Sequence, residues 1–219
     1  MMTTVPQKAY SKKSTTKQRL VETGLELMGR NGFHCASLQE ILSVANVPKG
    51  SFYYYFKSKE AFGIEVLESY WQEKVAWVES FLHLKHVSPI NRLRLLSLDA
   101  MLQIEQSGFE LVCMASRVNQ ERDTSTQAFK SCLEKGHAMR QSMLRAFFVE
   151  AQAFGEVPSN IHIDYLVESY QTHLDGALLE SKLTRSLRPF QVMHWLFFEC
   201  LCRPSHRLSE DEETKLTLS

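Results

Sequence analysis

Apolar residues recur along most of the chain at intervals of three or four positions, which is the spacing of one face of an amphipathic helix. Runs that alternate strictly between apolar and polar residues, as half-buried strands do, are lacking. The 9 glycines and 6 prolines stand mostly where helices are expected to begin or end. The pattern therefore predicts an all-α protein.

Capping residues divide this periodic pattern into separate helices. Ser37 and Glu40 form a capping box at the start of one helix, and the pair Asn31-Gly32 is typical of the end of the helix before it. The first four predicted helices cover about residues 15–30, 37–45, 48–56 and 58–81. Five more are expected to begin near Ser88, Phe109, Thr124, His162 and Pro189.

The second and third predicted helices are joined by only a few residues around Asn46, so they form a candidate helix-turn-helix. The third contains the aromatic stretch VPKGSFYYYFKSKEAF, residues 47–62. At about 100° per residue, one face of this helix carries the side chains expected to pack inward, which are Phe52, Tyr55 and Phe56. The opposite face carries Gly50, Ser51, Tyr53 and Tyr54.

A pair of outward tyrosines beside Lys49 suits a helix that enters a DNA groove. Tyrosine hydroxyls bond phosphates, tyrosine rings lie against sugars and thymine methyl groups, and a lysine reaches a base edge or a phosphate. Gly50 allows close approach of the backbone, and the helix N-termini at Ser37 and Ser58 offer N–H groups to phosphates. The alternative interpretation is an aromatic packing helix that is exposed by chance.

The charge distribution points to the same end of the chain. The formal net charge is zero, but residues 1–60 carry nine Lys or Arg against four Asp or Glu, whereas residues 61–219 carry sixteen against twenty-one. A basic N-terminal part and an acidic remainder indicate that only the first part meets a polyanion. Lysines near the N-terminus add salt-dependent affinity for DNA or belong to a solvated tail; they are Lys8, Lys12, Lys13 and Lys17.

Phe33 and the segment SLQEILSVANVPKGSFYYYFKSKE, residues 37–60, closely resemble the DNA-binding signature of the TetR family of bacterial transcriptional regulators. The resemblance covers roughly residues 15–62 and combines the capping position, the turn, the glycine and the aromatic block at fixed spacing. It implies an all-α homodimer, usually a repressor released by a small inducer. Two recognition helices about 34–36 Å apart, or somewhat more, predict a palindromic operator in double-stranded DNA.

The resemblance also implies roles for single residues and a division of the chain. Facing the major groove would be Lys49, Gly50, Ser51 and Tyr53. Holding phosphates would be Ser37, Tyr54 and Lys59, and in the core would be Phe52, Tyr55 and Phe56. The expected parts are a flexible basic arm (1–14), a three-helix DNA-binding domain (15–60), a helical sensor and dimerisation domain (61–205) and a polar tail (206–219). The helices of about residues 162–202 are expected to form the four-helix bundle of the dimer.

Two later segments resemble the NemR-type branch of the family, namely LVCMASR at 111–117 and GALLESKLTRSL at 176–187. This resemblance implies a sensor of reactive electrophiles and oxidants that uses Cys113 and Lys182. An ammonium beside a thiol favours the thiolate, which is the form that reacts. Two alternatives stay open. Cys113 is a small core residue and Lys182 extends to the surface, or the domain binds a non-covalent, apolar inducer.

Composition excludes several other classes of protein. Five cysteines form an odd and scattered set without zinc-ligand spacing, so no disulfide framework, metal or cofactor is expected. No apolar run has the 18 or so residues of a membrane helix and no secretory signal is present, which predicts a cytoplasmic protein. An enzyme with a thiol nucleophile would need a base such as His137 or His173, and no motif supports one. A helical protein-interaction adaptor is the alternative of another class.

Overall fold

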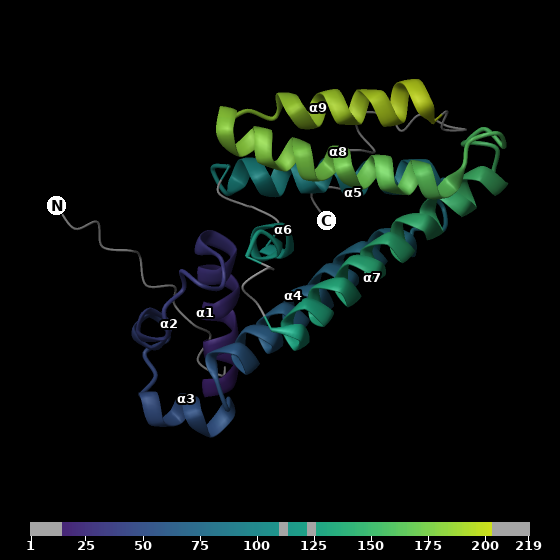
Figure 1. The fold of residues 1–219 in the computed structure, drawn as a ribbon. Helices are drawn as coiled ribbons and strands as arrows, with labels where there is room; N and C mark the ends of the chain where they lie inside the picture. Colours follow the sequence, from purple (N-terminus) through teal and green to yellow (C-terminus); the bar gives the residue numbers. More distant parts are fainter. Residues whose placement is uncertain (1–14, 110–113, 122–125, 203–219) are drawn as a thin grey trace. The chain divides into compact units, whose positions relative to one another are not determined.

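The computed structural model describes residues 15–109, 114–121 and 126–202. These residues form helices and no β-strand, which confirms the predicted all-α fold (Figure 1). The helices are α1 (Thr16–Asn31), α2 (Leu38–Ala45), α3 (Lys49–Tyr55), α4 (Lys59–Leu82), α5 (Pro89–Gln106), α6 (Met114–Asn119), α7 (Gln127–Ala153), α8 (Ile163–Thr184) and α9 (Arg188–Trp195), followed by the π-helical turn η2 (Leu196–Leu201).

The predicted N-caps of α2 and α4 are confirmed for their serine side chains. Ser37 Oγ accepts a hydrogen bond from Glu40 N at 3.1 Å, and Ser58 Oγ accepts one from Ala61 N at 3.0 Å. The helix predicted to begin near Phe109 corresponds to α6, which is described from Met114 onward. Gly108 and Phe109 both adopt positive φ angles, 62° and 65°, and this left-handed backbone ends the preceding helical segment.

The described residues fall into two compact units. Unit 1 contains residues up to Trp71 together with Met114–Leu133, and unit 2 contains Gln72–Cys113 and the residues from Glu134 onward. Helix α6 and the first turns of α7 therefore pack in the same unit as the helix-turn-helix. This division by packing differs from the predicted functional border at residue 60, which stays a prediction.

Unit 1 is built around aromatic side chains at the junction of α3 and α4. The rings of Phe52, Phe56 and Phe62 are buried and meet edge to face, with centroids 5.5 Å apart for Phe52–Phe62 and 5.0 Å for Phe56–Phe62. Gly24 lets α1 lie against α4, since a β-carbon there would stand 2.5 Å from Val66 Cγ2. The core thus fixes α3 against the helices that precede and follow it.

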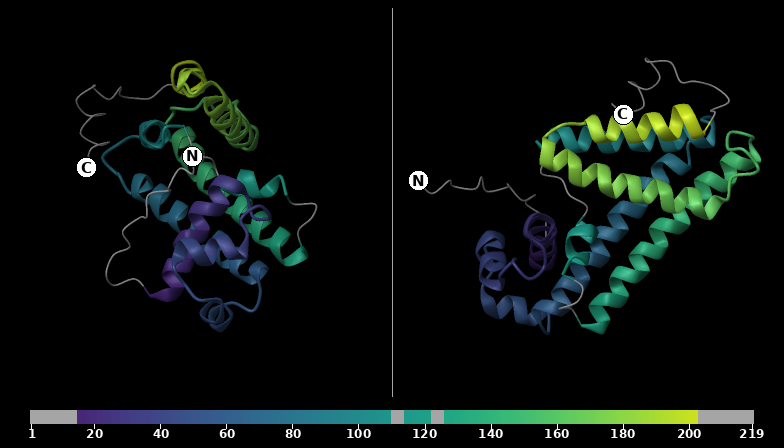
Figure 2. Two further views of the ribbon diagram at one scale, coloured as in Figure 1. Left: turned by 90° about the vertical axis from the view of Figure 1, so that its left-hand side faces the viewer. Right: turned by 45° about the horizontal axis from the view of Figure 1, so that its top comes forward.

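Unit 2 has its own aromatic core, in which α8 and α9 lie side by side (Figure 2). Tyr170 of α8 is buried between aromatic rings, with centroids 5.0 Å from Phe197 and 5.8 Å from Phe148. Burial raises the pKa of the Tyr170 phenol well above its usual range.

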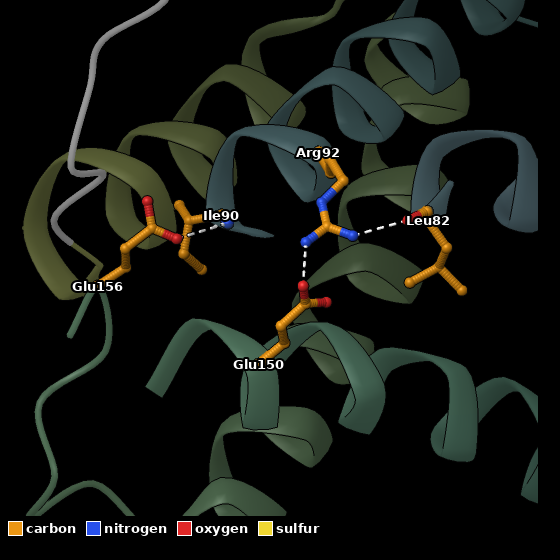
Figure 3. A network of polar contacts seen from close by, with 5 residues as sticks. All are labelled: Leu82, Ile90, Arg92, Glu150 and Glu156. Atoms are coloured by element: carbon orange, nitrogen blue, oxygen red, sulfur yellow. Dashed lines mark hydrogen bonds and ion pairs between the residues drawn. The ribbon is translucent and has the colours of Figure 1, made fainter. Parts of the chain in front are cut away.

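A buried arginine links three helix ends in unit 2 (Figure 3). Arg92 Nη1 donates to Leu82 O at 2.7 Å, and Nη2 donates to Glu150 Oε1 at 2.6 Å. Beside it, the buried Glu156 accepts a hydrogen bond from Ile90 N at 3.0 Å. These contacts join the end of α4, the start of α5 and the end of α7 with the turn that follows α7.

Candidate nucleic-acid interface

The turn between α2 and α3 is three residues long. Asn46 follows α2 in the left-handed conformation (φ 52°, ψ 53°), which asparagine tolerates better than most residues. Val47 is buried, and Pro48 precedes the first residue of α3 with an extended backbone. This is the tight helix-turn-helix connection that the sequence predicts.

The aromatic residues of α3 divide into inward and outward sets, largely as the helical phase predicts. Phe52 is fully buried, whereas Tyr53 is 51% exposed and Tyr54 is 81% exposed. The prediction that Tyr55 packs inward is wrong, because Tyr55 is the last residue of the helix and is 39% exposed, with its ring edge-to-face on Tyr54. Phe56 is buried as expected, but it lies beyond the helix in extended backbone.

The first turn of α3 is open to solvent. Lys49 and Gly50 are exposed and Ser51 is half-buried. A β-carbon added to Gly50 would meet no protein atom within 4 Å. The packing of the protein therefore does not require a glycine at position 50. Close approach of a partner to this turn is a separate reason for a glycine here.

The three residues predicted to hold phosphates are in different situations. Ser37 is exposed, and its oxygen accepts from Glu40 N while its O–H remains a donor. Tyr54 is the most exposed of the three tyrosines. Lys59 directs its Nζ at Phe33 O (2.8 Å) and His34 O (3.2 Å), so its ammonium is engaged inside unit 1. Burial lowers the pKa of this ammonium, and the negative charge of Glu121 opposes the shift.

Lys57 is an additional exposed cation between α3 and α4. The helical wheel gave it no role, because it lies outside the periodic part of α3. The structure shows that its side chain is exposed directly after the buried Phe56.

Of the two predicted sensor residues, Lys182 is among the described residues and Cys113 is not. Cys113 lies outside the described residues, as do Lys8, Lys12 and Lys13 of the N-terminal arm. Lys182 lies half-buried in the last turn of α8. Just beyond it, Arg185 Nη2 donates to Gly108 O at 2.9 Å, so the end of α8 contacts the segment that follows α5.

The other four cysteines are described, and none of them is part of a disulfide. Cys35 and Cys200 are exposed, while Cys132 and Cys202 are buried. Burial raises the pKa of the Cys202 thiol to about 12, which makes it unreactive at neutral pH. Within the described ranges, no group of three or more His, Cys, Asp or Glu side chains is placed to hold a metal ion. Over the same ranges, no helix is both long and apolar enough to span a bilayer.

Comparison with known proteins identifies the family to which the chain belongs. The chain matches the bacterial regulatory proteins of the tetR family over residues 20–66. It is also 32% identical over 176 residues to the transcriptional regulator AcuR of Cereibacter sphaeroides, and this alignment covers 80% of each chain. The protein belongs to the TetR family. It is therefore a DNA-binding transcriptional regulator and not an enzyme, as predicted.

Two further matches lie in the NemR-type branch of the TetR family. The HTH-type transcriptional repressor NemR of Escherichia coli K12 is 28% identical over 182 residues, covering 80% of this chain and 88% of NemR. The crystal structure of E. coli NemR in its reduced form superimposes with a TM-score of 0.80 at 25% identity, covering 87% of this chain and 99% of that one. The predicted resemblance to this branch of the TetR family is confirmed.

Proposed function

We propose that the protein is a homodimeric repressor that binds a palindromic operator and is released from it by a reactive electrophile or oxidant. The observation that carries the DNA-binding mode is the exposure of Tyr53 and Tyr54 on a short helix anchored by the buried Phe52. Large aromatic side chains that point into solvent from a rigid helix are suited to a partner that offers both phosphates and apolar surface. The name of the relative NemR, a repressor, supports repression over activation.

Helix α3 enters the major groove with its first turn. Lys49 reaches a base edge or a phosphate, Gly50 lets the backbone approach, and Ser51 and Tyr53 contact bases or the thymine methyl group. Ser37 and Tyr54 donate their hydroxyl hydrogens to phosphates on either side. Because the ammonium of Lys59 is engaged by two carbonyls, its phosphate contact is assigned to the backbone N–H at the start of α4.

A salt-controlled gel shift with the upstream region of the protein's own gene tests this interface. Lys49→Ala and Tyr53→Ala should each weaken binding by about 1–3 kcal/mol, or roughly 5- to 150-fold in Kd. Lys135→Ala, which removes an equal charge from an exposed site on α7, is the matched control and should bind nearly as the wild type does. Full operator affinity in both α3 variants would show that another surface reads the DNA.

The dimer interface is assigned to α8 and α9. These neighbouring helices expose large apolar side chains, namely Tyr165 (72%), Leu179 (63%), Leu183 (77%), Val192 (53%) and Trp195 (59%). Leu179 and Leu183 are four residues apart on α8, so they share a face of the helix. Burying one such side chain stabilises an interface by about 1.5–3 kcal/mol, which favours a second copy of the chain as the cover.

Release from DNA is assigned to Cys113 together with Lys182. The support is the contact of Arg185 with Gly108, since it brings the end of α8 to a segment only five residues ahead of Cys113. Mass spectrometry after exposure to a quinone or a thiol-reactive aldehyde should find the adduct on Cys113. Cys113→Ser should keep DNA binding and lose release, whereas Cys35→Ser, which removes an exposed thiol elsewhere, should respond as the wild type does. Unchanged release in Cys113→Ser would favour a non-covalent inducer instead.

A further inference from the structure

The loop between α1 and α2 is bonded by side chains that are distant in the sequence. It begins at Gly32, where φ is 85°, and leads within five residues to Ser37, the N-cap of α2. Lys59 Nζ donates to Phe33 O and His34 O, and it also lies 4.7 Å from the centroid of the Phe33 ring. The carbonyl groups of two consecutive residues are thus fixed by the first residue of α4.

Glu121 fixes the N–H groups of the same two residues. Its Oε2 accepts from Phe33 N at 2.7 Å and from His34 N at 3.1 Å. Hydrogen bonds to an ionised carboxylate are shorter and stronger than neutral ones. A β-carbon at Gly32 would overlap this carboxylate, so a side chain at position 32 is incompatible with the contact.

Glu121 lies on the turn that continues α6. Glu121 N donates to Val118 O at 3.0 Å, which continues the helical turn beyond Asn119. Met114 and Val118 of α6 are buried in the core of unit 1. A shift or rotation of α6 would therefore displace Glu121 relative to the loop, and the loop is covalently continuous with the N-terminus of α2.

An apolar contact supports the same loop from α7. The Phe33 ring lies 4.7 Å from that of Phe129, and Gly63 of α4 leaves room for both rings. Phe33 is thus packed between α4 and the start of α7. The loop is therefore held by polar contacts from Glu121 and Lys59 and by the packing of the Phe33 ring.

We propose that Glu121 is a positioning residue that couples α6 to the DNA-reading helices by holding the loop in the position that binds the operator. The proposal rests on the placement of Ser37 and α3 on DNA given above, but it does not depend on Cys113 or on the nature of the trigger. Operator binding and the position of α6 are then linked through one carboxylate, and the linkage is reciprocal.

Glu121→Ala removes the contact, and Glu121→Gln keeps its shape with a neutral acceptor. Operator affinity should fall about 10-fold or more in Glu121→Ala, within the usual range of coupling between sites, and by a smaller factor in Glu121→Gln. Glu68→Gln, at an exposed site on α4 of the same unit, is the charge-matched control. Removing a negative charge by itself strengthens binding to a polyanion, so this control should bind equally well or slightly better.

Hydrogen–deuterium exchange separates coupling from simple support of the fold. In the wild type, operator DNA should slow exchange in the peptide that contains α6, residues 114–119. In Glu121→Ala, the amides of Phe33 and His34 should exchange faster in the free protein, and DNA should no longer protect α6. If Glu121→Ala does not fold, Glu121→Gln decides the question.

Two results would overturn the inference. One is a Glu121→Gln protein that binds the operator as tightly as Glu68→Gln does. The other is DNA-induced protection of α6 that persists unchanged without the carboxylate. If either result is found while Lys49→Ala loses operator binding, the proposed DNA interface is supported. Only the role of Glu121 is then refuted.

Discussion

Three helical glycines of unit 1 give a test of the DNA-binding face that separates binding from folding. A β-carbon at Gly50 of α3 or at Gly29 of α1 would meet nothing within 4 Å. At Gly24, also in α1, it would stand 2.5 Å from Val66 Cγ2 and 2.6 Å from Phe62 Cζ. The fold should therefore accept alanine at Gly50 and at Gly29 but not at Gly24.

The magnitudes follow from these surroundings. Alanine stabilises a helix over glycine by at most about 1 kcal/mol, and for a chain of this size 1 kcal/mol raises the Tm by about 2–4 °C. Gly50→Ala and Gly29→Ala should leave the Tm unchanged or raise it within this range, with less gain at Gly50 because it lies in the first turn. Gly24→Ala should cost about 1–3 kcal/mol by overpacking against α4.

Operator affinity should differ between Gly50→Ala and Gly29→Ala, the two substitutions that leave the fold intact. If the first turn of α3 lies against the duplex, the new methyl group of Gly50→Ala meets DNA and should weaken binding by about 1–3 kcal/mol, a loss similar to one mismatched base pair. Gly29→Ala should bind as the wild type does. Fluorescence anisotropy with a labelled operator at one fixed salt concentration measures both, alongside thermal unfolding of the same samples.

Equal affinity of Gly50→Ala and Gly29→Ala would refute the placement of this turn in the groove, because the two proteins differ only in where the methyl group lies. A lower Tm in Gly50→Ala would instead contradict the open surroundings of Gly50 in the structure. A loss of operator affinity at an unchanged Tm cannot be attributed to unfolding, since the thermal measurement is made on the same protein.

Three further predictions concern unit 2. Burial, with the charge of Arg94 adding to it, lowers the pKa of His194 to about 4, so between pH 6.5 and 4 only the unfolded chain takes up a proton. The free energy of unfolding should fall by up to about 3 kcal/mol as the pH drops through this window, and His194→Gln should flatten that part of a urea-unfolding profile. Leu183→Glu should yield a monomer in analytical ultracentrifugation, whereas Val149→Glu, at an exposed site on α7, should not. Arg92→Met should lower the free energy of unfolding by about 1–3 kcal/mol in the same urea assay, because it leaves Leu82 O and the half-buried carboxylate of Glu150 without their donor.

The parts of the fold that were predictable from the sequence depend on neighbouring residues. The capping serines, the end of α2 before Asn46 and the inward Phe52 all follow from interactions within about five positions along the chain. For the same reason the outward direction of Tyr53 and Tyr54 was predictable. A helical wheel needs only the period of the helix.

The parts that were not predictable depend on helix ends or on distant contacts. Tyr55 is exposed because α3 stops there, and the wheel assumed that the helix continues. The backbone of Gly108 and Phe109 carries no periodic signal, and neither does the π-helical turn after Trp195. The engagement of Lys59 with the loop before α2 joins residues about 25 positions apart, so its ammonium was assigned to DNA when only the sequence was considered.

Two opposing effects decide whether replacing Glu121 strengthens or weakens operator binding. A carboxylate in a basic, DNA-binding unit opposes the approach of a polyanion, which alone would make its removal favourable for binding. In water, two unit charges interact by about 1 kcal/mol at 4 Å and by less at any greater separation, and physiological salt screens most of the interaction beyond about 8 Å. Each hydrogen bond from a backbone N–H to an ionised group contributes about 1.5–3 kcal/mol, and Glu121 accepts two of them at the loop that leads to Ser37. Because the local term is several times larger than the long-range one, replacing Glu121 should weaken operator binding even though it makes the unit more basic.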